Sequence, residues 1–291
     1  MSKLTVSVVV PAYNEAEAIG PVVAGLRSEL DKRGVESEII VVDDGSADDT
    51  AKAVSPAHAR VIRHPANRGY GQALLTGIEA AKHEWVLMID ADGSYPPAEI
   101  LSLLDFAPDY DLVIGKREGA HFWGTPTKAL LRWVYLRLAS FVAGFRVPDA
   151  NSGLRLVRKS LVDRQGLVRC LGYSFTTTMT LSFIVQGRLV KFHPIEFRAR
   201  GGGHSKVKPV RDILRTLQLM TQVMVIYNPL KLFAVIAIAF ALKSIAFYAA
   251  FLAGYSHSWL VCAGIAGLSA LLAFSIGCVL DSMRMHGQWR P

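Results

Sequence analysis

Short aliphatic runs alternate with longer segments of helical periodicity over the first 115 residues of the chain. The runs at 5–11, 38–42, 60–63, 85–89 and 111–114 are rich in Val, Ile and Leu, which predicts short strands buried on both faces. Helices are expected over 15–32 and 71–82, and a further helix is expected to open at 48–50. This alternation predicts a doubly wound α/β fold with a parallel sheet and helices on both faces.

The pattern changes near the C-terminus, where residues 229–280 carry almost no charge. The segments 232–255 and 258–280 are each more than 20 residues long, and a helix of that length crosses a hydrocarbon core of about 30 Å. Only Ser256 and His257 separate them, so we expect a transmembrane hairpin. Two helices buried in a soluble core are the alternative.

A third apolar pattern precedes the hairpin. Residues 209–227 place Val, Ile, Leu and Met at helical spacing, with Arg211 and Arg215 on another face. This pattern predicts an amphipathic juxtamembrane helix lying in the membrane interface, although an ordinary surface helix fits it too. The expected organisation is therefore a soluble α/β domain over 1–208, this helix over 209–227 and the hairpin with its tail over 228–291.

Charge places the expected domains relative to the membrane. Lys231 precedes the first span, Arg284 and Arg290 follow the second, and the turn between the spans has neither Lys nor Arg. By the positive-inside rule both ends of the hairpin face the cytoplasm. The N-terminus lacks the pattern of a signal peptide, so we expect a multi-pass protein of the cytoplasmic membrane whose α/β domain faces the cytoplasm.

The composition is apolar and basic, with 51% hydrophobic residues, a mean hydropathy of +0.30 and a formal net charge of +8. Such a charge attracts nucleic acid, an anionic membrane surface or a phosphorylated substrate. The basic residues concentrate between Arg188 and Lys231, just before the apolar block, and are not interleaved with stacking aromatics. The distribution therefore favours the membrane and argues against nucleic acid.

Polar clusters follow three of the predicted strands. They are Tyr13-Asn14-Glu15, Asp43-Asp44 and Asp90-Ala91-Asp92, and ligands of doubly wound sheets bind beyond the carboxyl ends of the strands. Asp90 and Asp92 predict a site for Mg²⁺ or Mn²⁺, which bind carboxylate oxygens and keep positions for water and a diphosphate. A surface turn is the alternative for these two residues.

The Asp43-Asp44 pair is expected to accept hydrogen bonds from a nucleobase or ribose. Helix capping by Asp44, Ser46 or Asp48 is the alternative reading of the same loop. Neither a GxxxxGK[ST] loop nor a GxGxxG loop after the first strand is present. A diphosphate would therefore need a metal on the Asp pair, with help from Arg and Lys.

Together these segments resemble a known family. Residues 8–15 (VVVPAYNE), 42–46 (VDDGS) and 90–96 (DADGSYP) look like family 2 glycosyltransferases of the GT-A fold, and within it like dolichol-phosphate mannose synthases and bacterial polyprenyl-phosphate glycosyltransferases. Further matches are 111–117 (DLVIGKR), 149–155 (DANSGLR) and 200–206 (RGGGHSK). The resemblance implies a mixed, mostly parallel sheet followed by an amphipathic helix and a transmembrane hairpin.

The resemblance also implies roles for individual residues. Pro11, Tyr13, Glu15 and Asp44 match positions that hold the nucleoside, with Asp43 beside them; Asp90 and Asp92 match the metal and donor-diphosphate site; and Arg117, Arg200, Ser205 and Lys206 match residues at the phosphates of donor and acceptor. The implied reaction is metal-dependent, inverting transfer of a sugar from a UDP- or GDP-hexose to undecaprenyl or dolichyl phosphate. Gly201-Gly202-Gly203 reads as a mobile lid or as a plain flexible loop.

The sequence departs from the family between residues 125 and 145, where Lys128 or Arg132 is left to face the acceptor. A processive polysaccharide synthase of the same fold would carry Gln-x-x-Arg-Trp, and here Ala129 stands at the Gln position before Arg132-Trp133. A catalytically silent membrane-anchored subunit that binds nucleotide-sugar is the other alternative. Small residues over 263–267 permit close helix packing, within the hairpin or in a homo-oligomer.

Overall fold

The computed structural model describes residues 4–164, 175–198, 218, 220–225 and 228–285. The chain forms two compact units, Met1–Thr216 and Leu217–Pro291, and each is described by itself. Most of the predicted juxtamembrane helix, residues 209–227, lies outside the described residues. The part of it that is described includes residues 220–225, which are helical.

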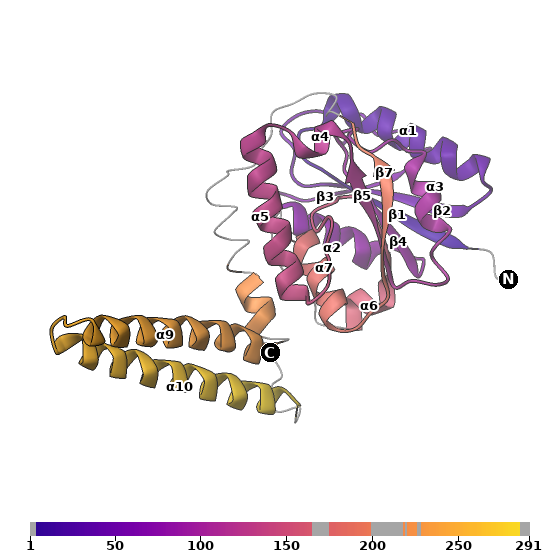
Figure 1. Ribbon diagram of the computed structural model, residues 1–291. Coiled ribbons are helices and arrows are strands. Elements are labelled where there is room, and N and C mark those ends of the chain that lie inside the picture. The colour runs from indigo at the N-terminus through magenta and orange to yellow at the C-terminus, as the bar shows by residue number, and fades with distance from the viewer. Residues whose placement is uncertain (1–3, 165–174, 199–217, 219, 226–227, 286–291) are drawn as a thin grey trace. The chain divides into compact units, whose positions relative to one another are not determined.

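A seven-stranded sheet forms the centre of the first unit, in the order β3-β2-β1-β4-β6-β5-β7 (Figure 1). The strands are β1 (Thr5–Ala12), β2 (Glu36–Asp43), β3 (Arg60–Arg63), β4 (Trp85–Met88), β5 (Leu112–Glu118), β6 (Arg155–Arg158) and β7 (Val190–Glu196). All neighbouring strands run parallel except β6, which is antiparallel to both β4 and β5. The predicted mixed, mostly parallel sheet is confirmed, and each of the five predicted strands is present.

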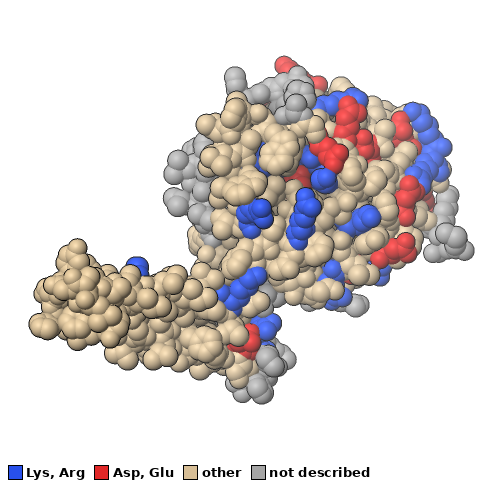
Figure 2. Space-filling view, viewed as in Figure 1, with Lys and Arg blue, Asp and Glu red and all other residues tan. Residues whose placement is uncertain are grey.

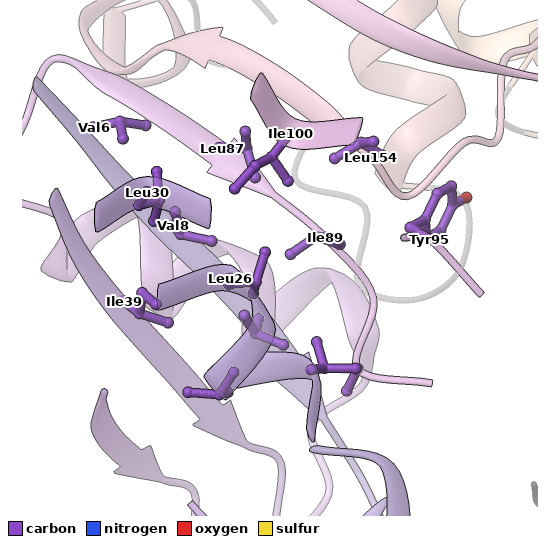
Figure 3. Close-up of a cluster of buried hydrophobic side chains, with 14 of the residues drawn as sticks. Val6, Val8, Leu26, Leu30, Ile39, Leu87, Ile89, Tyr95, Ile100 and Leu154 are labelled. Carbon is purple, nitrogen blue, oxygen red and sulfur yellow. The ribbon is translucent and has the colours of Figure 1, made fainter. Parts of the chain in front are cut away.

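Helices cover both faces of this sheet. On one face α1 (Ala16–Lys32) and α3 (Glu99–Leu104) bury aliphatic side chains against β1, β2 and β4. Figure 3 shows this cluster, in which Leu26 and Leu30 of α1 lie close to Val8 and Ile39. On the other face α2 (Tyr70–Ala80) and α7 (Phe175–Val185) pack against the side chains that the strands direct to that face. Burial of strands on both faces explains their continuous aliphatic sequences.

The prediction of a helix that opens at 48–50 is wrong, because the chain between β2 and β3 forms turns. Side chains there bond to the backbone in place of a helical ladder. The Asp48 carboxylate accepts hydrogen bonds from Thr50 N at 3.0 Å and from Ala16 N, in the first turn of α1, at 3.3 Å. Asp48 thus caps a helix that lies 32 residues earlier in the chain.

The described part of the first unit also contains three shorter or more exposed helices, α4 (Ala120–Trp123), α5 (Pro126–Ala143) and α6 (Lys159–Arg164). Much of the outer surface of α5 is apolar, and we call these exposed side chains the α5 ridge: Leu130, Leu131, Trp133, Val134, Leu138 and Phe141. Contiguous exposed apolar patches of this kind mark surfaces that meet a partner or a membrane.

The second unit contains two helices long and apolar enough to cross a membrane, α9 (Pro229–Leu252) and α10 (Ser258–Met285). They pack side by side along their length as a hairpin, and charged side chains are sparse along the two helices on the face that Figure 2 shows. Asn228 caps α9 by accepting a hydrogen bond from Lys231 N at 3.1 Å. Ala263 and Ala266 are buried inside the hairpin, whereas a Cβ at Gly264 would meet open space.

Candidate active site

The sheet brings five loops to one edge. The strands β1, β2, β4 and β5 all run in the same direction, although the antiparallel β6 lies between β4 and β5. Their carboxyl ends therefore share that edge. Because β6 is antiparallel, Arg155 at its start pairs with Met88 at the end of β4. The loop before β6, residues 149–153, therefore joins the polar loops that follow the other strands.

The two carboxylates that end β2 are both buried and both organise loops. Asp43 Oδ1 accepts a hydrogen bond from Ser46 N at 2.9 Å, and Arg63 Nε lies 3.2 Å from Oδ2. Asp44 accepts hydrogen bonds from Arg68 N at 2.9 Å and Gly69 N at 2.8 Å, just before α2. Asp44 thus holds the residues that lead into α2, 25 residues further along the chain, and does not cap a helix in its own loop.

A buried histidine completes the surroundings of Asp44. His64 Nδ1 lies 2.6 Å from Asp44 Oδ1, and its Nε2 lies 3.0 Å from Thr76 Oγ1 on α2. Both ring nitrogens are thus engaged, which fixes the ring in one orientation against the carboxylate. His64 directly follows the short strand β3, and no motif in the sequence marks it as part of the site.

The loop after β1 is hydrogen-bonded to the loop after β2. Asn14 N donates to Ser46 Oγ at 2.9 Å, Ala47 N donates to Asn14 Oδ1 at 2.8 Å, and Glu15 N donates to Thr50 Oγ1 at 2.9 Å. Pro11 is buried at the end of β1, while Tyr13 and Glu15 are partly exposed beyond it. All five residues predicted for the nucleoside therefore belong to one connected pair of loops.

Asp90 and Asp92 follow β4 and are held from several sides. The Tyr70 hydroxyl donates to Asp90 Oδ1 at 2.7 Å. Asp92 Oδ1 accepts hydrogen bonds from Ser94 N at 3.0 Å and Ser94 Oγ at 2.5 Å. A Cβ built at Gly153 would lie 2.2 Å from Asp90 Oδ2, so only glycine lets the 149–153 loop approach this carboxylate.

This donor set fits a divalent cation. Carboxylate oxygens are the ligands that Mg²⁺ and Mn²⁺ prefer, and these ions commonly use one or two carboxylates plus water and substrate phosphate. Within the described part of the chain, no third His, Cys, Asp or Glu joins Asp90 and Asp92 in a metal-binding group. The remaining coordination positions would therefore fall to water and to a substrate.

Arg117, at the end of β5, forms a bidentate ion pair with Asp149. Its Nε and Nη2 lie 2.8 Å and 2.9 Å from the two carboxylate oxygens, and its backbone N donates to Oδ2 at 3.2 Å. Burial would raise the pKa of Asp149, but Arg117 holds that pKa below its ordinary value. Asp149 opens one of the segments that resemble the family, but no role for it was predicted from the sequence.

A fully buried arginine shapes the loop that contains Asp149. Arg155 donates from Nε to Ser152 O at 2.7 Å, from Nη2 to Ala150 O at 2.7 Å and from Nη1 to Thr180 Oγ1 at 2.8 Å. Burial lowers the pKa of Arg155 to about 10, so the guanidinium stays charged at neutral pH. The Arg155 side chain thus fixes the 149–153 loop by donating hydrogen bonds to backbone carbonyl groups of that loop.

A second guanidinium lies beside Arg117. Arg132 of α5 stacks over the Phe122 ring with its Cζ 4.4 Å from the centroid, and Arg117 Cζ lies 5.2 Å from the same ring. Burial and the charge of Arg117 lower the pKa of Arg132. Lys128, the other candidate from the sequence, is exposed one turn earlier. Arg200, Ser205 and Lys206 lie outside the described residues.

Solved structures with a similar fold place this architecture in a class. Glucosyl-3-phosphoglycerate synthase from Mycobacterium tuberculosis matches with a TM-score of 0.60 and 23% identity over 75% of this chain and 79% of the other. Mannosyl-3-phosphoglycerate synthase from Rubrobacter xylanophilus matches with a TM-score of 0.57 and 21% identity over 76% and 72%. The fold is that of the GT-A glycosyltransferases.

The family follows from the sequence comparisons. The family model described as glycosyl transferase family 2 matches residues 7–166, and the chain belongs to that family. It is 28% identical to an undecaprenyl-phosphate mannosyltransferase of Micrococcus luteus, over 70% of this chain and 88% of the relative. It is 30% identical to an undecaprenyl-phosphate 4-deoxy-4-formamido-L-arabinose transferase of Pseudomonas fluorescens, over 81% and 69%. The protein is a glycosyltransferase.

Proposed function

We propose that this glycosyltransferase moves a sugar from a nucleotide-sugar to polyprenyl phosphate, with inversion and with a divalent cation, at the cytoplasmic face of a membrane. The observation that carries the proposal is the juxtaposition of Arg117 and Arg132 over one aromatic ring, with Arg117 paired to the Asp149 carboxylate. Two guanidinium groups placed together suit an anionic substrate. The two relatives are both named as transferases that use undecaprenyl phosphate.

The donor site would lie along the carboxyl edge of β1, β2 and β4. The loops of Tyr13–Glu15 and Asp43–Ser46 would hold the nucleoside, and Asp90 and Asp92 would hold the cation. When bound, the cation stabilises negative charge on the leaving diphosphate. Glucosyl-3-phosphoglycerate synthase has been crystallised with Mn²⁺ and UDP-glucose, which supports Mn²⁺ or Mg²⁺ here.

The acceptor needs little activation. A phosphate monoester is already anionic at neutral pH, so its oxygen can attack the anomeric carbon while the carbon–oxygen bond to the diphosphate breaks. The electron pair leaves with the nucleoside diphosphate, and no proton has to move. This agrees with Asp149, which is a weak base because it is paired with Arg117 and its pKa is lowered. Arg117 and Arg132 would orient the nucleophile and offset its charge.

A hollow of about 1060 Å³ beside α5 offers room for the acceptor. Its walls include Arg117, Phe122 and Trp133, so cationic and aromatic side chains lie together. An isoprenoid phosphate combines a hydrocarbon chain with an anionic head and matches both features. The α5 ridge and the hairpin are further apolar surfaces suited to a substrate that resides in a bilayer.

The reaction itself is tested by transfer of radiolabel from a panel of UDP- and GDP-sugars to a short polyprenyl phosphate in detergent, with and without Mn²⁺. We expect a metal-dependent, chloroform-extractable product from at least one donor. A labelled polymer would instead identify a processive polysaccharide synthase. Donor binding without any transfer would identify a silent nucleotide-sugar-binding subunit.

Replacing Arg132 by Gln is expected to raise the KM for polyprenyl phosphate by about 10- to 100-fold, because a hydrogen bond to a charged group is worth about 1.5–3 kcal/mol. The control is Lys128→Gln, which removes a charge from the exposed position one turn earlier on α5. Steady-state rates with varied acceptor at saturating donor provide the measurement. An equal rise in both variants, or none in Arg132→Gln, would contradict the assignment.

The orientation of the hairpin gives a separate test. The starting variant has its three natural cysteines replaced by Ala. A single cysteine is then introduced either by Ser256→Cys, in the turn between α9 and α10, or by Ser282→Cys, near the end of α10. We expect a membrane-impermeant maleimide added to intact cells to label the turn and not position 282, because Lys and Arg flank the cytoplasmic ends. The opposite labelling pattern would reverse the proposed orientation.

A further inference from the structure

Three consecutive residues at the start of α2 contact two different parts of the site. The backbone N–H groups of Arg68 and Gly69 donate to Asp44, which ends β2. The hydroxyl of Tyr70 donates to Asp90 Oδ1, beyond the end of β4. The segment 68–70 thus joins the carboxylate on the nucleoside side to a carboxylate proposed to hold the cation.

The backbone of this segment requires glycine at its centre. Gly69 has φ 96° and ψ 155°, a conformation that side chains disfavour. This conformation lets the Gly69 N–H point to Asp44 while the side chain of Tyr70 reaches Asp90. The helix that follows is firmly placed, because a Cβ at Gly77 would lie 2.2 Å from Val9 Cγ1 of β1. Tyr70 therefore projects from a rigid support.

Asp90 is held between two opposing groups. The Tyr70 hydroxyl donates a hydrogen bond to Oδ1 at 2.7 Å, and the backbone of Gly153 lies close to Oδ2. A hydroxyl that donates to one oxygen of a carboxylate restrains the orientation of that carboxylate. Partners of this kind fix the orientation of metal-binding side chains, and their loss typically lowers metal affinity about 10- to 100-fold.

We propose that Tyr70 is a positioning residue that orients Asp90 for a divalent cation, and that the segment 68–70 couples cation binding to nucleoside binding. The inference rests on the proposed function, since it takes Asp90 as a cation ligand. It adds a residue that belongs to none of the matched sequence segments. The ligand concerned is a nucleoside diphosphate with its divalent cation.

The test uses the full chain in detergent and compares Tyr70→Phe with Tyr110→Phe. Both variants lose only a hydroxyl, but Tyr110 lies at the edge of the core and contacts the Phe106 ring. Binding of Mn²⁺ in the presence of UDP or GDP is measured from the electron paramagnetic resonance signal of the free ion. Binding of the nucleotide alone is measured by calorimetry in EDTA.

We expect Tyr70→Phe to weaken Mn²⁺ binding by about 10- to 100-fold and to leave metal-free nucleotide binding unchanged, while Tyr110→Phe matches the unmodified chain in both. Equal Mn²⁺ binding by Tyr70→Phe would overturn the inference alone. Loss of metal-free nucleotide binding as well would show a general structural role and would also overturn it. Absence of Mn²⁺ binding by the unmodified chain would overturn the metal-dependent part of the proposed function together with this inference.

Discussion

Replacing Asp92 by Asn is expected to reduce sugar transfer by at least about a thousandfold while the protein folds and inserts normally. A cation that stabilises the leaving diphosphate contributes several kcal/mol to the transition state, and each 1.36 kcal/mol changes the rate tenfold. The amide oxygen of Asn can still accept the hydrogen bonds that Ser94 donates to Asp92. The loop is therefore preserved while one anionic ligand is lost.

Transfer of radiolabel to polyprenyl phosphate measures this loss, and thermal unfolding in detergent checks the fold. Asp49→Asn is the matched control, because Asp49 is a surface carboxylate whose side chain is 74% exposed and pairs with Lys52. The control should transfer at the normal rate. Normal transfer by Asp92→Asn would remove Asp92 from the cation site.

Replacing Arg155 by Met is expected to lower the free energy of unfolding by about 3 kcal/mol. Met fills much of the same volume but leaves the carbonyl oxygens of Ala150 and Ser152 without their donors, and each buried unsatisfied group costs about 1–3 kcal/mol. Relief from burying a charge offsets part of this loss. Because the 149–153 loop contains Asp149, transfer activity should fall as well.

The unfolding temperature measures this destabilisation, and for a unit of this size 3 kcal/mol corresponds to about 6–12 °C. Arg33→Met serves as the control, since Arg33 pairs with Asp105 at the surface and such pairs contribute about 0–1 kcal/mol. An Arg155→Met variant as stable as this control would show that the loop does not depend on the buried guanidinium.

The strands that could be predicted from the sequence are largely buried, apart from β3, whose residues are half-buried or exposed. Such strands are continuous aliphatic runs, as Thr5–Ala12 shows. The strands β6 and β7 were not predicted. Arg155–Arg158 begins and ends with arginine and looks polar, yet Arg155 is completely buried by bonds to distant carbonyl groups. Val190–Glu196 contains a proline, which is unusual inside a strand.

The candidate site was predictable where its residues follow parallel strands. Asp44 and Asp90 each lie just beyond the end of a strand, so the sheet itself brings them to one edge. Tyr70 and Asp149 could not be found in this way, because they reach their partners across 20 and 32 residues of chain. Neither contact leaves a periodic signal. The proposal of Arg132 rather than Lys128 as the acceptor contact likewise rests on the position of Phe122, which belongs to a different helix.

The apolar surface of α5 also affects how the protein can be handled. A chain that ends before Pro229 would lack both long apolar helices but would retain the α5 ridge, where Leu130 and Leu131 are each more than half exposed. Apolar side chains on such a surface promote self-association in water. Deleting the hairpin therefore does not by itself yield a freely soluble enzyme, and purification of a shortened chain calls for detergent or for polar substitutions along this helix.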